Sequence, residues 1–174
     1  MKCRQILFIF FILLSHKSFS LTADSNKINA IRKMVRSINA DTSYVIKKLE
    51  NEDFMDQATD RGGHLEGYFK KGKLVKIVEW VGVSSCINVT EYYLQNEKLI
   101  FAYTKGFEFQ YVDSIATFNS NQILTMECRF YFENNKMIKS ILKGATRCGG
   151  AALETWAKTD IVNTAKYRHL LTKK

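Results

Sequence analysis

Three segments of this chain repeat one local pattern, and that repetition constrains the fold more than any other feature. Aligned on a tyrosine, the segments read YFKKGKLV from Tyr68, YLQNEKLI from Tyr93 and YFENNKMI from Tyr131. Each has an aromatic-rich run, two turn-type residues, a lysine and a second apolar run. Two β-rich runs separated by a two-residue break indicate a tight β-hairpin. The sequence therefore predicts three hairpins.

The expected turns are Lys71-Gly72, Asn96-Glu97 and Asn134-Asn135. Such turns need positive φ at their central residues, which Gly and Asn tolerate best. Glu97 is the least suitable of these residues and is expected to cost stability. The copies are unequally spaced, whereas a solenoid keeps one period. We therefore expect an antiparallel meander with an extra excursion over residues 113–124.

The runs beside the turns alternate as half-buried strands do. Cys128, Phe130 and Phe132 would share one face, with charged residues between them. Gly106 interrupts a similar alternation and predicts a bulge in one long strand. The run 73–81 is apolar on both faces, which places it in the middle of the sheet.

Helices are expected at both ends of the sheet. Residues at helical spacing form one apolar stripe: Ile28, Ile31, Val35, Ile38, Thr42, Val45 and Leu49. A bend or break in this helix is expected at 39–43. Arg32, Lys33 and Arg36 lie off this stripe, as expected for a solvated face or for contact with anionic lipid or cell-wall polymer. A weaker stripe predicts a second helix over 151–171. The predicted class is α+β: a meander of six or seven strands with an N-terminal and a C-terminal helix covering one face.

This order of elements resembles a group of small secreted bacterial proteins of uncharacterised function. The segments IRKMVRSIN, GYFKKGKLVKIVEW, EYYLQNEKLIFAY and ECRFYFENNKMIKSIL carry the likeness, which covers residues 28–142. The resemblance implies export and an antiparallel sheet with flanking helices. It implies no activity and no catalytic residues.

The first twenty residues have the three-part pattern of a secretory signal peptide. Lys2 and Arg4 precede an apolar run over 6–14, and Ser18 and Ser20 supply small residues before a cleavage site. We expect cleavage between Ser20 and Leu21, export to the periplasm or beyond, and a single domain over 21–174. Cleavage would lower the formal charge from +9 to +6, a moderately basic value that identifies no partner. No segment is long and apolar enough for a transmembrane helix.

Four residues are expected towards one edge of the meander, because strand direction alternates: His64, Cys86, Cys128 and Cys148. One interpretation is a disulfide between Cys148 and either Cys86 or Cys128, with one buried free thiol, as is common in exported proteins. The other is a Cys3His metal site or a Cys–His nucleophile pair. The short ligand spacings of structural zinc sites are missing, so no metal or other cofactor is expected.

Aromatic residues on the strands give a second candidate site. Tyr92, Tyr93 and Tyr131 form either a core beneath the helices or, where one of Tyr92 and Tyr93 faces away from them, a binding surface. The chain has no phosphate-binding loop and no zinc-protease motif. The predicted function is an exported non-enzymatic binding module that uses a sheet face or loop edge. Its partner would be a protein, peptide or glycan rather than a nucleic acid, and no oligomeric state is indicated. The alternative is an exported thiol enzyme or metal-binding protein at the Cys/His edge.

Overall fold

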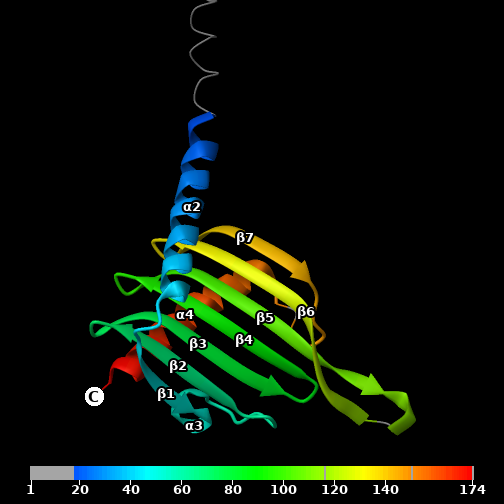
Figure 1. Ribbon diagram of the computed structural model, residues 1–174. Coiled ribbons are helices and arrows are strands. Elements are labelled where there is room, and N and C mark those ends of the chain that lie inside the picture. Colours follow the sequence, from blue (N-terminus) through cyan, green and yellow to red (C-terminus); the bar gives the residue numbers. More distant parts are fainter. Residues whose placement is uncertain (1–17, 116, 150, 174) are drawn as a thin grey trace, which may run out of the picture.

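Seven strands form one antiparallel sheet whose spatial order is the order of the sequence (Figure 1). The computed structural model describes residues 18–115, 117–149 and 151–173. Its elements are α2 (Ser18–Ala40), β1 (Val45–Glu50), α3 (Asn51–Phe54), β2 (Gly63–Lys70), β3 (Lys73–Val83), β4 (Cys86–Gln95), β5 (Lys98–Val112), η1 (Asp113–Ile115), β6 (Thr117–Glu133), β7 (Lys136–Gly144) and α4 (Leu153–Thr172). The predicted α+β meander with a helix at each end is confirmed.

The three repeated segments are hairpins with two-residue turns. The last paired residues are Lys70 with Lys73, Gln95 with Lys98, and Glu133 with Lys136. All six turn residues have positive φ, the backbone that a type I′ turn requires. The turn predictions are therefore confirmed, and Glu97 holds a φ of 63° that glutamate rarely adopts.

Replacing Glu97 with Gly is expected to raise the melting temperature, because Gly adopts positive φ without a Cβ clash. The gain is about 1 kcal/mol in the free energy of unfolding. Glu97 also lies 3.6 Å from Arg168, but this exposed ion pair contributes little. Thermal unfolding measures the effect, and Asn135→Gly at the equivalent position should gain less because Asn tolerates positive φ. A lower melting temperature for Glu97→Gly would show that the contact with Arg168 outweighs the backbone cost.

The two terminal helices lie on opposite faces of the sheet, not on one face as the sequence predicted. Figure 1 shows α2 in front of the strands and α4 behind them. Under α4, the helix residues Ala157, Tyr167 and Leu171 pack on large side chains of β2–β6, which include Leu65, Ile77, Tyr92, Phe130 and Phe132. Under α2, the helix residues Ile28 and Ile31 pack on a separate set of strand residues: Tyr93, Ile100, Phe101 and Tyr131. Neighbouring strand residues point to opposite faces, so each face has its own apolar set to cover.

Residues 45–49 form a strand, although their spacing continues the helical stripe. The helix ends at Ala40, and the Asp41 carboxylate accepts hydrogen bonds from the Ser43 N–H and hydroxyl at 2.9 and 2.7 Å. This local turn competes with the helix. The chain then pairs along β2, where Lys47 Nζ donates to the carbonyls of Leu171 and Lys173 at the end of α4. These contacts make 45–50 the first edge strand.

Strands β5 and β6 continue past the sheet as a long hairpin arm, at the lower right of Figure 1. The pairing shifts register between Gly106 and Phe107, which confirms the predicted bulge. The excursion expected at 113–124 is the end of this hairpin, where η1 closes the turn. Exposed apolar side chains along the arm include Tyr111, Phe118 and Ile123.

The predicted signal peptide falls, except for its last three positions, on residues 1–17, which lie outside the described residues. It stays a prediction. Among the helices of the described ranges, none combines the length and the apolar character needed to cross a membrane.

Candidate functional site

A cleft lies where α2 crosses the sheet. It has a volume of about 530 Å³ and opens between the helix and strands β4–β7. Its walls and floor are Arg32, Val35, Arg36 and Asn39 of α2, Glu91 and Tyr93 of β4, Phe101 and Tyr103 of β5, Arg129 and Tyr131 of β6, and Ile141 and Lys143 of β7. We call this the α2 cleft.

The floor of the α2 cleft is aromatic. Tyr93, Phe101 and Tyr131 are buried and lie on neighbouring strands, because their positions pair across the sheet. The ring centroids of Phe101 and Tyr131 are 4.9 Å apart, and those of Tyr93 and Phe101 are 5.6 Å apart. Such tilted ring packing is favourable and gives a rigid surface.

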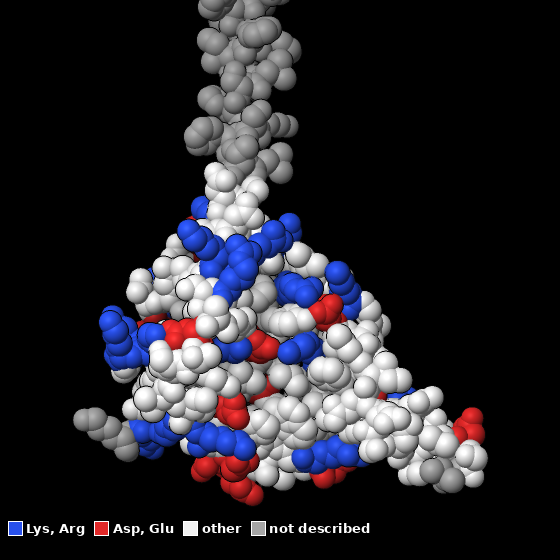
Figure 2. Space-filling view, in the orientation of Figure 1, with Lys and Arg blue, Asp and Glu red and all other residues white. Residues whose placement is uncertain are grey.

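The rim of the cleft is basic. Arg32, Arg36, Arg129 and Lys143 stand against one acidic residue, Glu91. Figure 2 shows basic side chains gathered around α2 where the helix meets the rest of the molecule. This imbalance gives the cleft a positive potential.

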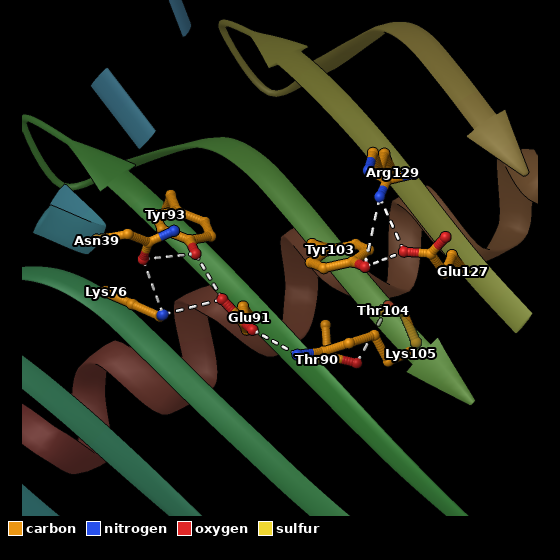
Figure 3. Close-up of polar contacts among 10 residues, drawn as sticks. All are labelled: Asn39, Lys76, Thr90, Glu91, Tyr93, Tyr103, Thr104, Lys105, Glu127 and Arg129. Carbon is orange, nitrogen blue, oxygen red and sulfur yellow. Dashed lines mark hydrogen bonds and ion pairs between the residues drawn. The ribbon is translucent and has the colours of Figure 1, made fainter. Parts of the chain in front are cut away.

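The single acid of the cleft is already neutralised by neighbouring residues (Figure 3). Glu91 accepts from Lys76 and Lys105 at 2.9 Å each and from the Tyr93 hydroxyl at 2.5 Å. Burial alone would raise the pKa of Glu91, but these three donors outweigh it and lower the pKa to about 2. Glu91 is therefore a fixed anion whose charge the two lysines balance.

A second network holds Arg129 at the rim (Figure 3). Its Nη2 lies 2.9 Å from Glu127 Oε1, and its guanidinium lies over the Tyr103 ring, 4.6 Å from the centroid. The Tyr103 hydroxyl donates to Glu127. Burial and this hydrogen bond raise the pKa of Tyr103 to about 12, and the same bond lowers the pKa of Glu127. The guanidinium is thus oriented before any ligand arrives.

Two cations of the rim form no close ion pair within the described part of the chain, although Lys143 lies opposite Glu127 in the β6–β7 pairing. Arg36 and Lys143 are exposed and form no ion pair there. Arg32 donates from Nε to the Tyr131 hydroxyl at 3.2 Å, a neutral partner. These three side chains can pair with an incoming anion.

The cleft offers no group suited to proton transfer at neutral pH. Its lining contains neither histidine nor cysteine, and burial raises the pKa of Tyr93 far above its usual range. A general acid or base works best with a pKa near the operating pH. The arrangement can bind an anion and hold aromatic or apolar groups beside it.

Of the predicted tyrosines, the structure brings Tyr93 and Tyr131 together in the cleft and places Tyr92 elsewhere. Tyr92 lies beneath α4 and donates to Glu79 Oε2 at 2.7 Å. All three are almost fully buried. The alternative in which Tyr92 or Tyr93 faces away from the helices is wrong, because each face of the sheet has its own helix, and the alternative in which these tyrosines belong to the core is confirmed.

The structure does not bring His64, Cys86, Cys128 and Cys148 into one site. Cys86 and Cys148 form a disulfide with Cα atoms 6.2 Å apart, which is one of the two predicted pairings. Cys128 is a free thiol buried beneath α4, where burial raises its pKa to about 11. His64 stacks on Trp80, with ring centroids 5.4 Å apart. The described residues contain no group of three metal-ligating side chains.

Sequence reasoning missed most of the cleft. Arg129 was recognised only as one of the charged residues that alternate with Cys128, Phe130 and Phe132, and neither Glu91 nor Lys143 was singled out. The available signal was the pair of adjacent aromatics, Tyr92-Tyr93 and Phe130-Tyr131. Large side chains at consecutive strand positions indicate that both faces are covered, and hence that a helix borders each face.

Comparison with known proteins adds no relative to this description. No protein-family model matches the chain, and neither does any curated protein or solved structure. The resemblance to secreted hairpin proteins stays a prediction, and function must be inferred from the chemistry of the cleft.

Proposed function

We propose that the protein is an exported, non-enzymatic binding module and that the α2 cleft holds an anionic group of its ligand. The proposal rests mainly on the charge of the cleft lining, which has four cationic side chains above an aromatic floor. Its one acid, Glu91, is already neutralised by two lysines. Arginine guanidinium groups pair with carboxylates, phosphates and sulfonates through two parallel hydrogen bonds. A ligand that carries such a group beside a ring or apolar part fits this chemistry.

Preorganisation supports a binding role. Arg129 is held by Glu127 and Tyr103, and Arg32 lies over the Tyr131 ring. Side chains that are already fixed lose less conformational freedom when a ligand binds. The cleft therefore keeps part of its basic rim in place without a ligand.

The cysteine chemistry supports this proposal over the thiol-enzyme alternative. A reactive cysteine needs an exposed, electropositive setting that stabilises its thiolate. Cys128 has the reverse, since it is buried near Asp160, whose charge adds to the effect of burial on the thiol pKa. The other two described cysteines are joined to each other.

Export is supported by the disulfide together with the predicted signal peptide. Disulfides form and persist in oxidising compartments and are rare in the cytosol. The bond between Cys86 and Cys148 joins the start of β4 to the loop between β7 and α4. Such a bond suits the periplasm or the extracellular space.

The test uses 1-anilinonaphthalene-8-sulfonate, which joins a sulfonate to aromatic rings. The wild-type protein should bind one equivalent with increased fluorescence. The Arg36→Glu/Lys143→Glu variant should bind at least about tenfold more weakly, since two rim cations become anions and each ordinary ion pair contributes about 1 kcal/mol. Both residues are exposed, so the fold should be kept.

Lys33→Glu/Lys73→Glu is the matched control. Lys33 shares α2 with Arg36, and both control residues are exposed and lie outside the cleft lining. The control makes the same change in net charge and should leave binding nearly unchanged. Equal loss in the two variants would show attraction by overall charge alone, and no binding to the folded wild type would contradict the proposed site.

A further inference from the structure

The face of the sheet that α2 occupies continues well beyond the helix. Cross-strand pairs place Val78 with Glu91, Trp80 with Val89, and Val89 with Lys105 on this face. In Figure 1 the helix crosses only one end of the strands, so the remainder of the face is uncovered. Any ligand in the α2 cleft has this surface beside it.

A second cluster of aromatic and basic side chains lies at the far end of the same face. Trp80, Ile87, Phe109 and Phe118 surround an open hollow with Arg61 at its edge. The Arg61 guanidinium lies 4.2 Å from the Phe109 ring centroid. Trp80 stacks on His64 with ring planes 8° apart. We call these residues the distal cluster.

The two sites are too far apart for one small molecule. Tyr93 lines the α2 cleft and Ile87 lines the distal cluster, and both lie on β4. They are six positions apart along the strand, which corresponds to roughly 20 Å. A ligand that touches both sites must be a chain.

The surface between the sites carries two acids, and the charge of one of them, Glu91, is balanced by lysines. Glu91 is bound by Lys76 and Lys105, and Glu66 accepts from the Tyr68 hydroxyl at 2.8 Å. Arg61 at the distal end forms no ion pair within the described residues, and donates to the Ser84 carbonyl instead. Free cations thus stand at both ends of the surface, which complements a chain with repeated negative charge.

The strands beneath this surface exclude the usual way of binding a peptide. An extended peptide adds to a sheet through the backbone groups of an edge strand. Strands β3, β4 and β5 each pair with a neighbour on both sides, so their backbone groups are already used. Recognition must come from side chains, here the half-buried Trp80 ring and the exposed Phe118 ring with Arg61 beside them.

Sugar rings suit such side chains, because the C–H groups on their flat faces pack against aromatic rings. Carboxylates on the same sugars would pair with the arginines. We propose that the ligand is an acidic polysaccharide, a chain of uronic-acid units that runs from the α2 cleft to the distal cluster. This inference rests on the proposed function, since it extends the same binding site.

The test compares galacturonic acid with its linear hexamer by isothermal titration calorimetry. The hexamer should bind the wild-type protein at least about tenfold more tightly, because one chain engages two linked sites. Arg61→Gln/Phe118→Ser should remove most of this advantage. Arg61 and Phe118 are exposed, with Phe118 39% accessible, so the variant should fold. Its binding of 1-anilinonaphthalene-8-sulfonate in the α2 cleft should be unchanged.

Lys73→Gln/Ile123→Ser makes the same kinds of change away from the surface. Ile123 lies on β6, as Phe118 does, is exposed, and lines neither site. This control should keep the full advantage of the hexamer. Equal affinities for monomer and hexamer, with the sulfonate still bound, would overturn the extended site and leave the proposed function standing.

Two further probes separate the ligand classes. Poly-glutamate binding more tightly than the galacturonate hexamer would overturn the polysaccharide in favour of an acidic peptide. A neutral hexasaccharide that binds as tightly as the acidic one would show that the basic residues take no part. Failure of both the sulfonate and the uronates to bind would instead contradict the proposed function.

Discussion

The Asp160→Asn variant is expected to be more stable than the wild-type protein at pH 8 and close to it at pH 4. Asp160 lies on α4 with 2% of its surface exposed, and no described residue donates a hydrogen bond to its Oδ2. Burial and the nearby Glu79 carboxyl raise the pKa of Asp160 to about 8. A neutral amide of the same shape avoids an isolated buried charge.

The sign of the pH dependence follows from that pKa. An aspartate in the unfolded chain has a pKa near 3.9, so between about pH 4 and pH 8 the folded state binds more protons. A group whose pKa is raised by folding contributes its full stability at a pH below its pKa in the unfolded chain. That contribution is lost as the pH rises through its pKa in the folded protein. A difference of one in pKa corresponds to about 1.4 kcal/mol, so the expected gain at pH 8 is on the order of 3–5 kcal/mol.

Glu79 adds to the same trend. It accepts hydrogen bonds from Tyr92 at 2.7 Å and from Tyr167 at 2.5 Å, yet burial outweighs them and raises its pKa. Denaturant unfolding of wild type and variant between pH 4 and pH 8 measures the difference. Glu154→Gln, an exposed acid on the same helix, should leave the pH dependence unchanged. A constant difference between wild type and Asp160→Asn across this range would show that Asp160 does not hold its proton.

Removing the disulfide in the Cys86→Ala/Cys148→Ala variant is expected to cost about 4 kcal/mol of folding free energy. The bond closes a chain segment of 62 residues, and the loss of loop entropy in the unfolded chain grows with that length. The bond also fixes the loop before α4, where Arg147 pairs with Glu108 at 3.1 Å. Loss of the bond therefore loosens the connection that leads into the helix of the main core.

Urea unfolding with and without a reductant checks this value. The reductant should destabilise the wild type by a similar amount and have no effect on the double variant. Thiol labelling supplies a second readout, since only Cys128 among the three described cysteines should react, and only after unfolding. A wild-type protein that is indifferent to reductant would contradict the structural role of the bond.

The hairpins were predictable because their information is local. A turn such as Asn134-Asn135 specifies its backbone through its own residues, and alternation such as that of Phe130 and Phe132 specifies the strand beside it. Strand β1 was not predictable in this way. Val45 and Leu49 fit a helical spacing as well as a strand, and the decision comes from β2 and from the end of α4, which Lys47 contacts.

The candidate site was even less predictable than strand β1, because its residues come together only through the tertiary structure. Arg36 and Arg129 are 93 positions apart, and only the docking of α2 on one particular face brings them into one cleft. The sequence expectation put both helices on one face, which would have left the other face of the sheet bare. The disulfide partner of Cys148 was likewise open until the strands were placed.

Helices on both faces also protect the sheet against misalignment during folding. If one central strand slid by a single residue, its two sets of side chains would exchange faces. Glu91 would enter the apolar core beneath α4, and the Tyr92 hydroxyl would lose Glu79. Such an error would therefore strand the Glu91 charge in a dry interior and remove an apolar set from each of the two cores. The arrangement that provides a binding face therefore also fixes the alignment of the strands.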